Sequence, residues 1–251
     1  MSGHSKWHSI KHKKGALDAK RGKIFTKHAK LIAISARDGG SDPEMNPTLR
    51  TAIANAKADN TPNTNIEKAI KKGAGLDKEG MELHEILYEG FGPEGTAFYV
   101  HVVTDNKNRS VANVKSCLTK NGGQMGEAGS VGWIFEKKGL ILAKAEGKDK
   151  EEAELEVIDA GAEDISLDGD LFEISTDATE LMKVRDALEK AEFKIEKAEL
   201  TYNPQNTVKI DSLEQAKKVL KLAEALDDEE DVANVYSNFD IPEDILEQAS
   251  L

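Results

Sequence analysis

The residues with the clearest chemical character are the basic side chains at the start of the chain. The first 30 residues contain nine Lys and Arg and one acidic residue, Asp18. The whole chain has a formal net charge of −12, yet residues 1–75 carry +9 and residues 76–251 carry −21. Ammonium and guanidinium groups gathered in this way neutralise phosphates. A basic head on an acidic body therefore indicates a polyanionic partner, most often nucleic acid.

We predict that residues 4–30 bind nucleic acid. Residues 4–14 lack a periodic apolar face, so we expect an arm that becomes ordered on its partner. Lysines would contact phosphates, and Trp7 and the histidines would stack on bases. The alternative is that Trp7 and Ile10 hold the arm against the helices that follow. The predicted binding residues of this segment are Lys6, Trp7, Lys11, His12, Lys13, Lys14, Lys20, Arg21, Lys23, Lys27 and Lys30.

A second basic pair, Lys107 and Arg109, is predicted to bind nucleic acid more weakly. The two residues lie at the start of a predicted helix that extends to about residue 120. The helix macrodipole disfavours cations there, so their presence suggests an anion bound among them and the free N–H groups. We expect this site to face the same way as the arm. The alternative is that Asp105 neutralises both cations.

Two segments match catalytic or cofactor motifs only in part. Residues 90–95 fit G-x-G-x-x-G, but they contain Pro93 and precede a strand, whereas the dinucleotide motif opens a helix. We interpret them as a hairpin loop. His84 and Glu85 begin like the zinc motif H-E-x-x-H, but residue 88 is tyrosine. Cys117 has no local activating residue and is interpreted as part of the core.

The histidines at positions 4, 8 and 12 have helical spacing, but no cysteine or carboxylate joins them and lysines surround them. We therefore expect no metal, no cofactor and no small-molecule substrate, and predict that the protein is not an enzyme. One alternative is an enzyme whose catalytic carboxylates are hidden among the 46 acidic residues. Another is a protein–protein adaptor that works through the acidic body.

Composition limits the class of protein further. The chain has 251 residues and one cysteine, which excludes an internal disulfide framework. No apolar run approaches the roughly 20 residues of a membrane span, and no apolar segment follows the basic start as in a secretory signal. We expect a cytoplasmic monomer with no membrane partner.

The basic side chains must be positioned by a helical domain over residues 1–75. The apolar spacing predicts a first helix over residues 15–37, with its lysines in an arc separate from the apolar side. A solvated face is the simpler explanation of such an arc. Gly39 and the glycine after it end this helix. Asn46 and the following proline begin a second helix, and residues 64–67 form a capping box for a third. The core of this bundle is small, so we expect it to lean on another domain.

Residues 76–136 and 204–251 predict a discontinuous α/β domain. Two strands flank residues 90–95, and helix and strand patterns after residue 204 can complete the same sheet. Trp133 and Phe135 alternate, which predicts a strand with both side chains on one face. Five glycines lie within residues 122–132, and they shape a bend or admit a nucleic-acid backbone.

Residues 137–203 predict an inserted ferredoxin-like domain, because their element order is β-α-β-β-α-β. The acidic run at residues 227–231 is interpreted as a solvated loop. The expected fold class is therefore multi-domain α+β: a three-helix domain followed by two α/β sandwiches, one inserted in the other.

Six segments are distinctive enough to carry a resemblance. They are residues 3–7 (GHSKW), 10–14 (IKHKK), 18–27 (DAKRGKIFTK), 88–93 (YEGFGP), 104–109 (TDNKNR) and 129–133 (GSVGW). With them the chain resembles the YebC family, which includes mitochondrial translational activators of cytochrome oxidase synthesis. The resemblance implies three domains, one helical and two α/β. It implies a cytoplasmic, DNA-binding transcriptional regulator, or alternatively a translational activator that binds the ribosome or its RNA.

We therefore predict a non-enzymatic regulator of gene expression that binds DNA, structured RNA or both. No helix-turn-helix recognition helix is evident, and a Lys/His arm reads shape and phosphate, which suits structured RNA.

Overall fold

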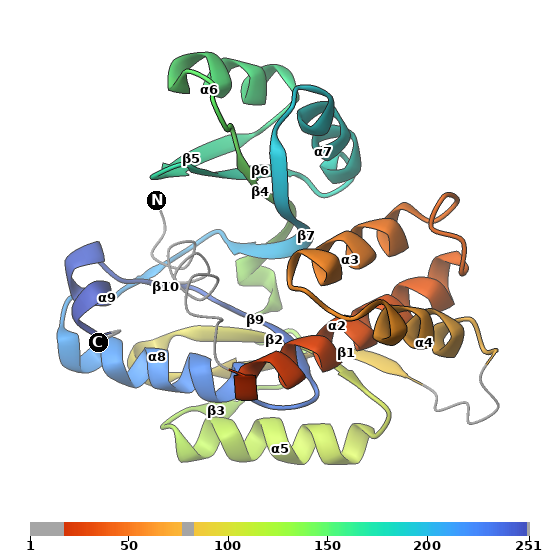
Figure 1. Ribbon diagram of the computed structural model, residues 1–251. Coiled ribbons are helices and arrows are strands. Elements are labelled where there is room, and N and C mark those ends of the chain that lie inside the picture. The colour runs from red at the N-terminus through yellow and green to blue at the C-terminus, as the bar shows by residue number, and fades with distance from the viewer. Residues whose placement is uncertain (1–17, 77–82, 250–251) are drawn as a thin grey trace.

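The N-terminal unit consists of three helices. The computed structural model describes residues 18–76 and 83–249, and at the N-terminal end it describes side chains from residue 22 onwards. The helices are α2 (Asp18–Gly39), α3 (Pro47–Ala58) and α4 (Asn63–Gly73) (Figure 1). Their shared core is small and consists of Ile32, Ala36, Leu49, Ala56, Ile66 and Ala69.

The ends of these helices follow local sequence signals, with one exception. Gly40 adopts φ +90° directly after α2, and the Asn46 side chain accepts a hydrogen bond from the Leu49 N–H at 3.0 Å. The predicted stop of the first helix and the predicted cap of the second are therefore confirmed. The capping box predicted at residues 64–67 is wrong. The helix α4 begins directly after Pro62, before the predicted box, and Pro62 makes no cap bond because its side chain has no hydrogen-bonding atom.

The helix α2 packs on two sides. Ile32 and Ala36 face the other two helices, whereas Ala33 and Ile34 pack with Val103 and other residues of the adjacent sheet. The small helical core therefore leans on a neighbouring unit, as expected.

That neighbouring sheet has four antiparallel strands in the order β3-β1-β2-β9. The strands are β1 (His84–Phe91), β2 (Ala97–Thr104), β3 (Gln124–Met125) and β9 (Val232–Ser237). A short 3₁₀ turn, η1 (Pro93–Gly95), connects β1 and β2, which confirms the hairpin loop. The sheet is discontinuous in sequence, because β9 returns to it after a long excursion of the chain.

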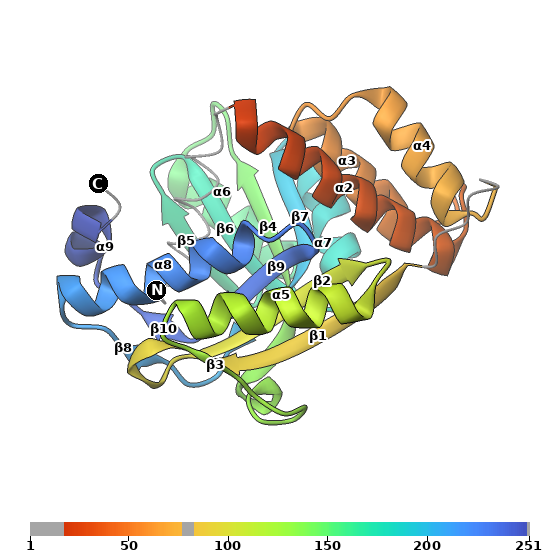
Figure 2. The same cartoon turned by 90° about the horizontal axis from the view of Figure 1, so that it is seen from below.

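Two helices, α5 (Lys107–Lys120) and α8 (Leu213–Asp227), cover the face of this sheet that lies away from α2 (Figure 2). The last helix, α9 (Glu243–Ala249), packs against α8. Two short strands, β8 (Val208–Lys209) and β10 (Phe239–Asp240), form a separate parallel pair. The core under α5 and α8 includes Phe98, Val100, Val114, Leu118, Leu222, Leu226 and Val235.

The excursion between β3 and β8 forms a second antiparallel sheet in the order β5-β6-β4-β7. This is the strand order of the split βαβ arrangement, as the element order predicts. The elements are β4 (Phe135–Lys144), α6 (Lys150–Asp159), β5 (Asp164–Asp168), β6 (Leu171–Asp177), α7 (Leu181–Lys190) and β7 (Lys194–Pro204).

The glycine-rich segment before β4 differs from the prediction. Trp133 lies in a 3₁₀ turn, η2 (Gly132–Ile134), and is 68% exposed, whereas Phe135 begins β4 and is buried. The two side chains do not share one face of a strand. A turn forms there because the buried carboxylate of Glu89 binds several N–H groups of this segment, including that of Gly132 at 2.7 Å.

The multi-domain α+β class is thereby confirmed, while the residue bounds of the three domains stay a prediction. Among the helices of residues 18–76 and 83–249, none is both long and apolar enough to cross a bilayer.

Candidate nucleic-acid interface

Three of the predicted binding residues lie on one face of α2. Lys23, Lys27 and Lys30 are spaced i, i+4 and i+7, which places them above one another on a helix. We call this set the basic face. It is directed toward the end of α8, which lies beside α2 in Figure 1. The basic face therefore points toward another part of the same chain.

The partner of the basic face is the run of five acidic residues 227–231, which we call the acidic segment. Lys23 Nζ lies 3.4 Å from the Asp228 carboxylate. Lys27 Nζ lies 2.8 Å from the Asp227 carboxylate. Both ion pairs are accompanied by bonds to the backbone, because each ammonium also donates to the carbonyl oxygen of the same aspartate, at 3.1 and 2.6 Å. The interpretation of residues 227–231 as a solvated loop is therefore wrong for Asp227, which ends α8, and for the buried Asp231.

Helix geometry explains why lysines bind here. The helix α8 ends at Asp227, and the last carbonyl groups of a helix have no intrahelical partner. These carbonyls also form the negative end of the helix dipole. Lysine side chains that reach a helix C-terminus satisfy the carbonyls and complement the dipole. The basic face thus binds both the carboxylates and the terminal carbonyls.

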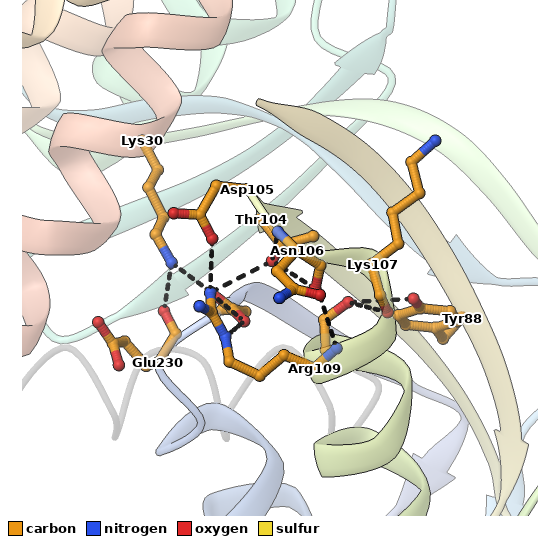
Figure 3. Close-up of polar contacts among 10 residues, drawn as sticks. Lys30, Tyr88, Thr104, Asp105, Asn106, Lys107, Arg109 and Glu230 are labelled. Atoms are coloured by element: carbon orange, nitrogen blue, oxygen red, sulfur yellow. Dashed lines mark hydrogen bonds and ion pairs between the residues drawn. The ribbon is translucent and has the colours of Figure 1, made fainter. Parts of the chain in front are cut away.

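Asp231 is the buried end of the contact. It is 4% exposed, and it receives Lys30 Nζ at 2.8 Å and the Arg109 guanidinium at 2.9–3.0 Å. Burial alone would raise the pKa of the Asp231 carboxyl, but the hydrogen bonds from Lys30 and Arg109 outweigh it and hold this pKa below its usual range. Lys30 also donates to the carbonyl oxygen of Glu230 at 2.8 Å (Figure 3).

The second predicted basic pair diverges in space. The Arg109 guanidinium points toward Lys30 and bonds to Asp105 at 2.8 Å as well as to Asp231, whereas the exposed Lys107 side chain points away from this cluster (Figure 3). The Asn106 side chain accepts a hydrogen bond from the Arg109 N–H at 3.1 Å, as a helix N-cap. The structure therefore brings Arg109, but not Lys107, together with the basic face.

The other predicted residues cannot be placed. Lys20 and Arg21 belong to α2, but their side chains lie outside the described residues. The same is true of the whole arm, including the histidines weighed as a metal site. The arm residues are Lys6, Trp7, Lys11, His12, Lys13 and Lys14.

Sequence reasoning missed the acidic half of this contact. The sequence did contain a relevant signal, the complementary charge of the lysine stripe and the acidic run. Residues 227–231 are the densest negative stretch of the chain and could pair with the lysines. The signal was not decisive, because runs of charge are ordinarily solvated. Only the packing of α2 on the sheet brings the two segments together.

A second missed feature is the carboxylate that shapes the glycine-rich segment. Glu89 is 8% exposed and accepts hydrogen bonds from the N–H groups of Gly129, Val131 and Gly132 at 2.6–2.7 Å. Burial acts to raise the pKa of Glu89, but the three backbone donors prevail and lower it. The ionised carboxylate thereby holds the turn that exposes Trp133.

Cys117 has none of the features of an activated nucleophile. It is buried in the core under α5, and burial raises the pKa of its thiol to about 11, so the thiol stays protonated at neutral pH. Within the part of the chain that the structure describes, no group of three or more His, Cys, Asp or Glu side chains is arranged to hold a metal ion.

Comparisons with known proteins cover almost the whole chain. The TACO1/YebC protein N-terminal domain matches residues 5–76, and the TACO1/YebC second and third domain matches residues 83–239. A probable transcriptional regulatory protein of Fusobacterium nucleatum subsp. nucleatum is 51% identical over 248 residues, which cover 99% of each chain. Another from Halothermothrix orenii is 48% identical over 250 residues, 99% of this chain and 98% of that one.

A crystal structure shows the same fold. It is that of a conserved hypothetical protein from Aquifex aeolicus, which is 46% identical and superposes with a TM-score of 0.87, covering 94% of this chain and 97% of the other. The resemblance noted from the sequence motifs is thereby confirmed. The chain belongs to the TACO1/YebC family.

Proposed function

We propose that this protein is a non-enzymatic regulator of gene expression that binds DNA through its basic N-terminal segment. Its relatives from Fusobacterium nucleatum and Halothermothrix orenii are named probable transcriptional regulatory proteins. The observation that carries the proposal is the charge distribution, +9 on residues 1–75 against −21 on the remainder. A localised positive charge on an acidic protein favours a phosphate backbone as partner. We place this function in the cytoplasm and expect a monomer.

A ribosome- or rRNA-binding translational activator is the second candidate. The three cations of the basic face are lysines, which contact phosphates as point charges. Sequence reading in the DNA major groove relies instead on bidentate side chains such as Arg, Asn and Gln. A lysine-rich surface reads backbone shape, which is how structured RNA is commonly recognised.

The test replaces Lys6, Lys11, Lys13 and Lys14 with Gln in the full chain and measures affinity over a salt series. If all four lysines contact phosphates, the slope of log affinity against log salt should fall by roughly 3 to 4, at about 0.7–0.9 per contact. The probes are a 20-base-pair DNA duplex and a structured RNA hairpin, and tighter binding of one decides between the two candidates. An unchanged slope with both probes would show that the arm holds no phosphate.

A matched variant controls for net charge. Lys150, Lys183, Lys190 and Lys194 are exposed lysines of the inserted sheet unit. Their replacement with Gln changes the net charge equally, so it should leave the slope close to that of the unmodified protein. The melting temperature of each variant separates loss of binding from loss of fold. A large decrease for the arm variant would show that these lysines support the fold rather than a ligand.

A further inference from the structure

We infer that the acidic segment, residues 227–231, is an internal substitute for nucleic acid that occupies the basic face of α2 and competes with the external ligand. The inference rests on the proposed function, because it requires that the basic face can bind phosphate. It adds an autoinhibitory contact to that function.

The chemistry of the contact is that of a lysine–phosphate interface. Each lysine of the basic face meets two oxygen acceptors, one carboxylate oxygen and one backbone carbonyl oxygen, at 2.6–3.4 Å. Phosphate oxygens would offer the same ammonium groups a negative charge and several acceptors at similar distances. Nucleic acid and the outer part of the acidic segment would therefore compete for the ammonium groups of Lys23 and Lys27.

The acidic segment also destabilises the C-terminal end of α8. Acidic side chains near a helix C-terminus are repelled by the negative end of the dipole, where cations are preferred. The helix α8 nevertheless ends at Asp227 with Asp228 as its C-cap, and three further acids follow. Residues that destabilise the helix in which they lie are expected at functional sites, where another interaction offsets the cost. Here the compensation is the basic face of α2.

The exposure of the three ion pairs decreases from Lys23–Asp228 to Lys30–Asp231. This order determines which pairs nucleic acid can displace. The Lys23 and Asp228 side chains are 51% and 57% exposed, so this ion pair is solvated and weak. The Lys27–Asp227 pair is less exposed, and Asp231 is buried beneath Lys30 and Arg109. We therefore expect nucleic acid to displace Asp228 and Asp227, while Asp231 stays bonded and keeps α2 docked on the sheet.

The test is the variant Asp227→Asn with Asp228→Asn, which removes the outer carboxylates and leaves Asp231 in place. Affinity for the same DNA duplex and RNA hairpin is measured at low salt. Removing the two competing carboxylates, while the backbone carbonyls stay, should raise affinity about 3- to 10-fold, the combined range expected for two partly solvated ion pairs. The single variant Asp228→Asn changes a half-exposed residue and should give a smaller gain in affinity. It tests the competition if the double variant folds poorly.

Two controls separate competition from a change in overall charge. Glu151→Gln with Glu152→Gln changes the net charge equally at exposed positions on α6 and should alter affinity by less than about 2-fold. Adding Lys23→Gln and Lys27→Gln to the Asp227/Asp228 variant should abolish its gain, because the gain requires those lysines.

The outcomes distinguish the two proposals. A gain that depends on the lysines supports competition. If the unmodified protein binds and the double variant binds no better than the α6 control, the autoinhibitory contact is refuted while the proposed function stands. If neither the unmodified protein nor the double variant binds either probe, the proposed function fails, and the competition inferred from it fails as well.

Discussion

At the scale of single residues, Asp231 is the most deeply buried carboxylate of the acidic segment. Its carboxylate is buried and is held by one ammonium and one guanidinium group. If the charge of Asp231 were removed, the charges of Lys30 and Arg109 would stay partly buried without their counter-ion, which costs free energy. The stabilising effect therefore depends on the ionised form of Asp231.

Substituting Asp231→Asn tests that dependence. We expect the free energy of unfolding to decrease by about 1–3 kcal/mol, since Lys30 and Arg109 lose charged hydrogen bonds but Arg109 remains partly solvated. Urea unfolding followed by circular dichroism measures the change. Substitution of the exposed Glu230, which contributes its carbonyl oxygen to Lys30, to Gln should have little effect.

The ion pairs of Asp231 with Lys30 and Arg109 also predict that the stability of the fold depends on pH. The pKa of Asp231 in the folded protein lies below 3.8, the ordinary value that the unfolded chain would have. Its stabilising contribution is therefore fully present above that value and is lost as pH falls through the lower, folded-state pKa. Melting temperatures of the unmodified protein and of Asp231→Asn should differ by a constant amount above about pH 5, and should converge in more acidic solution. Parallel curves down to the most acidic pH would contradict the ion-pair explanation.

Glu89 gives a second prediction at the residue scale. Substituting Glu89→Gln places an amide group opposite three backbone donors, so the turn before β4 should loosen and stability should fall by about 1–3 kcal/mol. The fluorescence of Trp133 reports on the turn once the other tryptophan, Trp7, is replaced by Phe. Glu127→Gln, an exposed change in the same segment, is the control. Identical spectra for the two variants would argue against this role of Glu89.

At the scale of elements, the position of α2 depends on close approach to α4. A Cβ atom added at Gly73 would lie 2.1 Å from the carbonyl oxygen of Ala33, closer than atoms can approach. The backbone of α4 can therefore contact α2 only through a residue without a side chain. This contact supports the helix that carries the basic face.

Alanine at two glycines should have opposite effects for this reason. Gly73→Ala should destabilise the protein by about 1–3 kcal/mol, because the two helices must move apart. Gly22→Ala should stabilise it by about 0.5–1 kcal/mol, because Gly22 lies in α2 with open space around its Cβ position. Thermal unfolding of both variants measures the difference. A Gly73→Ala protein as stable as the Gly22→Ala protein would mean that the α2–α4 contact is not close in solution.

At the scale of the whole molecule, opposite charges at distant positions in the sequence meet across one interface. The helical unit carries the basic face, and the acidic segment connects α8 to β9 of the first sheet. Long-range fields of opposite sign favour this docking and also attract a polyanion to the helical unit. The same charges thus serve the internal contact and, in our proposal, the external one.

The sequence alone determined the features that depend on local chemistry and periodicity. The Asn46 cap, the glycine stop after α2 and the β-α-β-β-α-β order follow from neighbouring residues, and the structure contains each of them. The family followed from short motifs as well. The basic segment could be identified as a candidate site because charge is a property of composition.

Only the tertiary structure decided what the charged residues contact. The lysine stripe of α2 is compatible with a solvated face, a nucleic-acid site or an internal contact, and periodicity cannot distinguish them. The partner residues 227–231 are about 200 positions away in sequence, so no local pattern links the two. Likewise, Glu89 folds the turn at Trp133 through bonds across about 40 residues, which overrides the alternating strand pattern. Both outcomes arise because buried or paired charges are satisfied by whichever groups the packed elements bring near.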